Sequence, residues 1–125
     1  MLKKLAVILM LLLPGAIVLG QDSYYMNKAK EYMRDAEYYN KRADSYQREA
    51  EYYTKQGQSY LREAEYYMKH NNSDKAKMYT SWAENSFDKA KTQMRWADDA
   101  RDKAMTRMKW AHEAMEKAQM EMKKY

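Results

Sequence analysis

The chain has 125 residues, which is enough for one domain at most, and it contains no cysteine. Its formal net charge is +5, and because both signs are interspersed along the chain, we expect no nucleic-acid binding. After residue 20 there is no Ile or Val, and only one Leu and one Phe. Branched aliphatic side chains normally fill a globular core, so this composition argues against a compact enzyme-like globule.

Residues 1–20 have the organisation of a secretory signal peptide. Lys3 and Lys4 form a short basic segment, an apolar run follows, and small or modest side chains precede a cut before Gln21. The apolar run is shorter than the roughly 20 residues that span a bilayer, although an uncleaved anchor is the alternative. We therefore expect a secreted, extracellular protein.

Residues 21–70 form a first repeat array with a period of 14 residues. Ala recurs every seven residues, with Gly57 in one of its places, and Tyr follows each of these positions three residues later. The residues are good helix formers, and a sustained repeat of seven is typical of a left-handed coiled coil. We expect one long helix with a seam of small side chains.

Residues 74–125 form a second 14-residue array, in which Ala recurs every seven residues and Trp every 14. Residues 71–73 separate the arrays. Asn71 can end the first helix in a left-handed conformation, and Asn72 or Ser73 can cap the second. Asn71-Asn72-Ser73 is also an N-glycosylation sequon, so Asn71 is a candidate glycosylation site.

The two arrays together predict an all-α fold, namely a long antiparallel two-helix coiled-coil hairpin with an Ala-rich heptad seam. The alternative is one long, kinked helix that dimerises. Because a two-helix hairpin buries little area, we expect self-association into a bundle or fibre.

Some aromatic side chains do not fit into the Ala seam. Helical geometry places one Tyr column on a second face of the first helix and one Trp column beside the seam of the second. We interpret these residues as candidates for assembly or, for the tyrosines, covalent cross-linking: Tyr24, Tyr38, Tyr52, Tyr66, Trp82, Trp96 and Trp110.

The sequence contains no catalytic motif, so we expect no enzyme activity, no cofactor and no metal site. The Met repeat follows the Ala seam and is interpreted as core filler rather than a copper site. The one acidic cluster comprises Asp98, Asp99 and Asp102. Basic neighbours favour a solvated salt-bridge surface there, and weak calcium or mineral contact is the alternative.

The organisation of the chain resembles that of small secreted extracellular-matrix proteins of the molluscan shell, of the nacre and prism matrix type. The shared features are the segment 1–20, the Tyr-Tyr repeats and the Met- and Lys-rich second array. The resemblance implies incorporation into an organic matrix around mineral. Since the shell proteins that nucleate mineral are highly acidic, the positive charge favours a framework role and leaves contact with a mineral surface open.

We therefore expect a secreted structural component of a matrix of the shell, silk, egg-case or adhesive type. Its partners would be further copies of itself and other matrix components. One alternative is a soluble helical binding or carrier protein with an aromatic groove between its helices. The other is a membrane-active helical peptide, which the interspersed charges disfavour.

Overall fold

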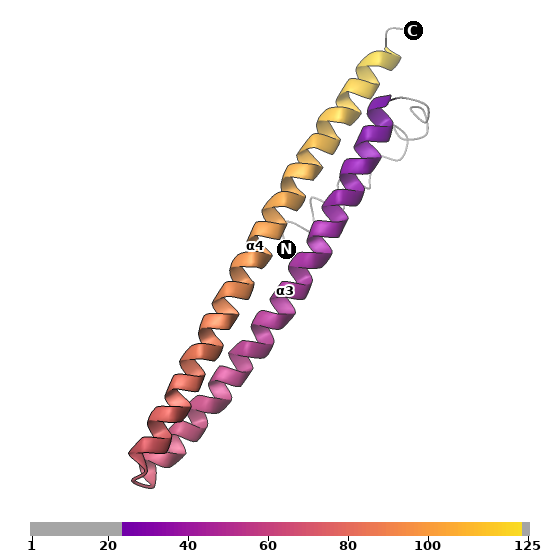
Figure 1. Cartoon of the computed structure of the whole chain (residues 1–125). Helices are drawn as coiled ribbons and strands as arrows, with labels where there is room; N and C mark the ends of the chain where they lie inside the picture. Colours follow the sequence, from indigo (N-terminus) through magenta and orange to yellow (C-terminus); the bar gives the residue numbers. More distant parts are fainter. Residues whose placement is uncertain (1–23, 124–125) are drawn as a thin grey trace. The chain divides into compact units, whose positions relative to one another are not determined.

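The computed structural model describes residues 24–123, and the two elements in this range are α-helices. Helix α3 spans Tyr24–Lys69, helix α4 spans Ser73–Met122, and the two pack against each other (Figure 1). The described range contains no β-strand. The prediction of an all-α protein is confirmed, while the expected signal peptide lies outside the described residues.

The residues of both helices favour an uninterrupted helix. Ala, Glu, Lys, Arg, Met and Gln are frequent, Pro is absent, and Gly57 is the one glycine in either helix. Interior threonines remain compatible with the helix because each hydroxyl donates to the carbonyl four residues earlier. These bonds run from Thr54 to Ala50, Thr80 to Ala76, Thr92 to Asp88 and Thr106 to Asp102.

The turn between the helices is built by two asparagines. Asn71 has a φ of 58°, which confirms the predicted left-handed conformation. The Asn71 N–H donates to the Met68 carbonyl and the Asn72 N–H to the Tyr67 carbonyl, the paired bonds of a Schellman motif. The Asn72 Oδ1 then accepts a hydrogen bond from the Lys75 N–H at 3.2 Å. Because Asn72 is the N-cap, Ser73 is the first residue of α4, although residues 71–73 were predicted to separate the two helices.

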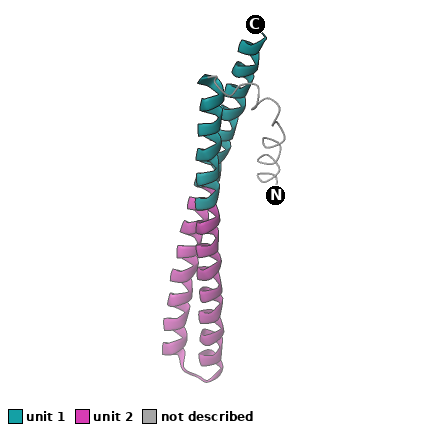
Figure 2. Ribbon diagram, turned by 90° about the vertical axis from the view of Figure 1, so that its right-hand side faces the viewer, with its two compact units in different colours: residues 1–42, 99–125 teal, residues 43–98 magenta. Residues whose placement is uncertain are grey.

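The chain divides into two compact units (Figure 2). Unit 1 comprises residues 1–42 and 99–125, of which 24–42 and 99–123 are described. Unit 2 comprises residues 43–98 and contains the turn. Each unit therefore takes one part of α3 and one part of α4.

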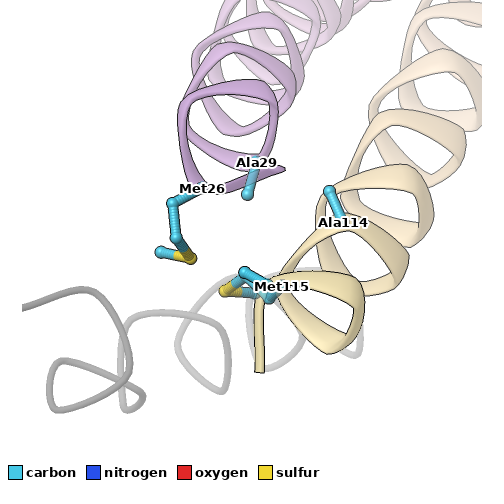
Figure 3. Packing of buried hydrophobic residues seen from close by; sticks show 5 residues of the cluster. Met26, Ala29, Ala114 and Met115 are labelled. Atoms are coloured by element: carbon cyan, nitrogen blue, oxygen red, sulfur yellow. The ribbon is translucent and has the colours of Figure 1, made fainter. Parts of the chain in front are cut away.

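The core of unit 1 combines alanines with methionines. Met26 on α3 and Met115 on α4 are almost fully buried and point toward each other, with Ala29 and Ala114 beside them (Figure 3). A second cluster joins Ala36, Ala104 and Met108, against which Tyr39 packs. Flexible Met side chains fill space that Ala alone leaves open.

The core of unit 2 is made of smaller side chains. Its buried hydrophobic residues are all alanines, and Ser86 is buried with them. Gly57 takes an Ala position where the Phe87 ring approaches the backbone, and a Cβ atom added there would lie 2.7 Å from the ring. Glycine is needed at this position because the Phe87 ring lies close to the backbone, and not because the backbone angle is unusual.

Candidate functional site

One column of tyrosines on α3 organises the contacts between the two helices. Its members lie seven residues apart and are all half-buried; we call them the seam tyrosines: Tyr25, Tyr32, Tyr39, Tyr46, Tyr53, Tyr60 and Tyr67. From Tyr32 onward, each lies three residues after a position of the Ala seam, and Tyr25 directly precedes buried Met26, so the column lies at the edge of the helix–helix contact. The column therefore gives one Tyr per heptad against which α4 packs.

Every second seam tyrosine packs against a tryptophan of α4. The ring centroids of these pairs lie 5.6 to 5.7 Å apart and the rings meet edge to face, the arrangement that aromatic quadrupoles favour. The pairs are Tyr32 with Trp110, Tyr46 with Trp96, and Tyr60 with Trp82. Each pair lies within one unit. From one pair of unit 2 to the next, the residue number rises by 14 on α3 and falls by 14 on α4.

Each of the four remaining seam tyrosines has a lysine of α4 over its ring. The Lys Nζ atoms lie 5.1 to 5.7 Å from the ring centroids, within the range of cation–π attraction. The pairs are Tyr25 with Lys117, Tyr39 with Lys103, Tyr53 with Lys89, and Tyr67 with Lys75. These lysines were not among the predicted contact residues, although each lies seven residues from a Trp.

The second Tyr column of the sequence analysis stands beside the seam tyrosines that face lysine. We call its members the outer tyrosines: Tyr24, Tyr38, Tyr52 and Tyr66. Each packs edge to face against the following seam tyrosine, with centroids 5.2 to 5.4 Å apart. The outer tyrosines and the three tryptophans have exposed fractions between 40% and 65%. These candidate assembly residues are therefore accessible to a partner.

The exposed aromatic side chains alternate between the two helices. A seam tyrosine that faces Trp has no outer tyrosine before it, because Glu31, Ser45 or Ser59 takes that place. A seam tyrosine that faces Lys has one. Along unit 2 the exposed rings thus follow in the order Trp96, Tyr52, Trp82, Tyr66, and along unit 1 in the order Tyr24, Trp110, Tyr38. In each unit, we call these exposed rings with their seam tyrosines the aromatic strip.

Polar pairs lie between successive aromatic layers. In unit 2 the Ser86 hydroxyl donates to Gln56 Oε1 at 3.2 Å. In unit 1 Arg107 Nε lies 3.7 Å from an Asp35 oxygen, an ion pair too long for a hydrogen bond, and its guanidinium stacks 4.4 Å from the Trp110 ring centroid. Both pairs use equivalent positions of the repeat.

Three of the four outer tyrosines also have a partner one turn later on α3. Lys28 lies over the Tyr24 ring, and Arg42 lies over the Tyr38 ring and donates to its hydroxyl at 3.1 Å. His70 stacks on Tyr66 with centroids 4.1 Å apart. These local contacts hold the exposed rings in place at an edge of the strip.

Unit 2 ends near the turn in a larger aromatic cluster. Tyr79 of α4 stacks on Tyr67 with an interplanar angle of 7° and also contacts Tyr60 and Trp82. Burial in this cluster, and then the nearby Tyr67 and Glu63, raise the pKa of the Tyr79 phenol above its ordinary value of 10.0. Tyr79 was not among the predicted assembly residues, and the sequence alone did not predict this cluster.

The remaining candidate residues are placed without forming a chemical centre. Asn71 is exposed in the turn. Among the residues in 24–123, no three or more His, Asp or Glu side chains are grouped so that they could hold a metal ion, and the acidic cluster at Asp98 makes no such group. Neither α3 nor α4 contains a segment long and apolar enough to cross a membrane.

The aromatic strip is therefore the feature of this protein that best qualifies as a functional surface. It repeats every 14 residues, draws on both helices and exposes large aromatic rings. Comparison with protein-family models, curated proteins and solved structures found no match to this chain.

Proposed function

We propose that this protein is a secreted structural component of an extracellular matrix, in which the aromatic strip makes lateral contacts. The observation that carries the proposal is the regular exposure of one large aromatic side chain per heptad in each unit. A regular row of large exposed aromatic side chains is typical of interaction surfaces.

The proposed architecture is an antiparallel coiled-coil hairpin. Its support is the pairing of Tyr46 with Trp96 and of Tyr60 with Trp82, in which residue numbers rise on α3 as they fall on α4. The Ala seam repeats every seven residues through both helices, which favours supercoiling over straight helices. Alanine brings helices close together but removes little apolar surface from water, so further association would add to stability.

The proposed assembly uses contacts between strips or covalent links between outer tyrosines. Exposed phenols can be oxidised by a peroxidase with hydrogen peroxide, which removes one hydrogen atom from each of two rings and reduces the peroxide to water. The two phenoxyl radicals then join as dityrosine. The proposal also includes secretion and N-glycosylation at Asn71. The sequon that contains Asn71 lies at an exposed turn, where a glycan can be attached.

The test begins with the full chain expressed through a eukaryotic secretory pathway. We expect a secreted product that begins at Gln21, carries a glycan on Asn71 and self-associates with rising concentration in sedimentation velocity. We also expect peptides of the chain, with dityrosine or hydroxylated Tyr at the Tyr-Tyr doublets, in the insoluble extracellular material of the producing organism after detergent washing.

Matched variants make this test specific. Replacing the four outer tyrosines with Ser follows the repeat itself, since Ser45 and Ser59 occupy equivalent positions. This variant should stay helical and lose most of its association. Replacing exposed Leu61 and Met94, which lie outside the strip, should leave association unchanged. A wild-type chain that remains a monomer at millimolar concentration would contradict the proposal.

A further inference from the structure

We propose that the aromatic strip binds an extended β-1,4-linked polysaccharide, the class that includes cellulose and chitin. This inference rests on the proposed function only in assigning the strip to contacts within an insoluble matrix. It adds a ligand of defined chemistry, recognised through the spacing and the exposure of the rings.

The exposed rings of the strip are regularly spaced along the helices. Seven residues of α-helix rise by about 10.5 Å, so the exposed rings of unit 2 follow one another at about that interval along the helix direction. An extended β-1,4-linked chain repeats after one disaccharide, which has nearly the same length. Because the linkage turns successive sugars over, every second sugar presents the same face, and each ring of the strip meets an equivalent face.

Neither helix has this spacing of exposed rings alone. On α4 the exposed tryptophans are 14 residues apart, about 21 Å, and the outer tyrosines on α3 have the same interval. Pairing the helices offsets the two columns by seven residues, so that Tyr52 falls between Trp96 and Trp82 in unit 2. The half-buried seam tyrosines run between the columns at the same heptad interval.

The strip combines aromatic rings with polar side chains. Sugar rings present C–H groups on their faces and hydroxyls at their edges, so they suit aromatic rings with polar groups between them. The strip of unit 2 has this composition: Lys75 and Lys89 lie over seam tyrosines, and the half-buried Gln56 side chain lies between two layers. Trp and Tyr also supply large contact areas with few rotatable bonds.

Charge favours a neutral polymer over a second copy as the occupant. Each strip carries a lysine in every second layer, so two facing strips bring like charges together unless they are displaced by one heptad. A neutral polysaccharide meets no such restriction and can bind in any register that places sugar faces on the rings. The experiment must therefore distinguish binding of a polysaccharide from binding of a second copy of this chain to the strip.

The test is co-sedimentation of the full chain with microcrystalline cellulose and with chitin. Granular starch, whose α-1,4-linked chains coil and lack the extended repeat, is the control polysaccharide. We expect binding to cellulose and chitin that is at least about tenfold tighter than binding to starch. Equal retention on starch, or no binding to either β-linked polymer, would overturn the inference.

Two double variants test the strip of unit 2. Trp82→Lys with Trp96→Lys uses the residue found at the equivalent positions 75, 89 and 103, and Tyr52→Ser with Tyr66→Ser uses the residue found at positions 45 and 59. Each should weaken binding to cellulose about tenfold or more while the far-UV circular dichroism remains helical. If the first variant loses helix, the second decides, because the outer tyrosines are the more exposed residues.

The matched control is Leu61→Ala with Met94→Ala. These side chains lie in unit 2, have exposed fractions of 41% each, close to those of the two tryptophans, and lie outside the strip. Their loss should not change polysaccharide binding. Undiminished binding by both strip variants, or equal loss in this control, would assign retention to general hydrophobicity and reject the strip as the site.

Sedimentation velocity of the same samples separates this inference from the proposed function. If the wild-type chain self-associates through the strip but does not bind cellulose or chitin, the proposed function stands and the polysaccharide inference is rejected. If the chain is monomeric and binds both polymers, the polysaccharide inference stands and the proposed self-assembly is rejected.

Discussion

Units 1 and 2 use the same heptad pattern but fill their interiors differently. Unit 1 buries Met26, Met108 and Met115 among its alanines, whereas unit 2 buries alanines and one serine. Unit 2 instead has the aromatic cluster around Tyr79 and the close approach of Phe87 to Gly57. The difference teaches that one repeat supports two kinds of packing, one based on buried methionine and one based on aromatic contacts at the edge of a thin core.

The polar pairs between the layers differ in the same way. Asp35 and Arg107 in unit 1 occupy the positions of Gln56 and Ser86 in unit 2. One pair is charged and stacks on Trp110, and the other is a neutral hydrogen bond. Buried alanines are common to both units, and the polar positions accept either chemistry. Four experiments test this comparison, in order of expected effect.

The largest effect should come from the buried methionine of unit 1. Met115→Ala removes a nearly fully buried side chain, and we expect unfolding in urea to show a loss of about 2–4 kcal/mol. Met120→Ala in the same unit is the control, because Met120 is 65% exposed and should change stability little. Equal effects of the two substitutions would show that buried methionine does not distinguish unit 1.

The next effect concerns the close contact of unit 2. Gly57→Ala places a methyl group against the Phe87 ring, which we expect to cost about 1–3 kcal/mol, partly offset by about 1 kcal/mol of helix propensity. Phe87→Met, the residue found at the equivalent position 94, should relieve the contact, so the double variant should be at least as stable as Phe87→Met alone. Thermal unfolding of all four chains gives the coupling, and additive effects would argue against this contact.

A smaller effect is expected from the charged pair of unit 1. Asp35 is about half exposed, so Asp35→Asn should cost only about 0.5 kcal/mol. The difference from wild type should largely disappear at about 1 M salt, where screening acts over roughly 3 Å. Gln56→Ala in unit 2 removes a neutral hydrogen bond, and its effect should not depend on salt. A salt-independent effect of Asp35→Asn would mean that packing, not charge, matters there.

The smallest effect is a decline of stability with rising pH, which begins only in alkali and which we attribute to Tyr79. Because the folded state raises the pKa of Tyr79, the phenol is protonated in both states below about pH 10, and its stabilising contribution is complete there. As the pH rises from 10 through the raised pKa, the unfolded chain ionises first and stability falls. Tyr79→Phe should flatten this alkaline decline in a urea titration followed by circular dichroism. An identical decline in both chains would show that Tyr79 does not control it.

Several features of the fold are predictable from local sequence. The Ala repeat and the helix-forming composition predict two long helices, and Asn71 predicts the left-handed residue that ends α3. These features depend on backbone preferences within a few residues of each position. The exposure of the outer tyrosines also follows from helical geometry, since they cannot share a face with the alanines.

The partners across the two helices required the structure. The sequence shows Lys89 and Trp96 seven residues apart, but it does not show that Tyr53 receives one and Tyr46 the other. In the same way, Gly57 reads as a gap in the Ala repeat until Phe87 is placed against it. A repeat of seven permits many registers between two helices, and local preferences do not choose among them.

The sequence by itself thus determined the helices, the turn and the columns of small and aromatic residues, because each follows from short-range backbone preference and from 3.6 residues per turn. Only the tertiary structure decided which columns meet, that exposed rings alternate between α3 and α4, and that methionine fills unit 1 alone. The physical reason is that register is fixed by side-chain volumes on both helices at once, so it is a property of the pair and of neither helix alone.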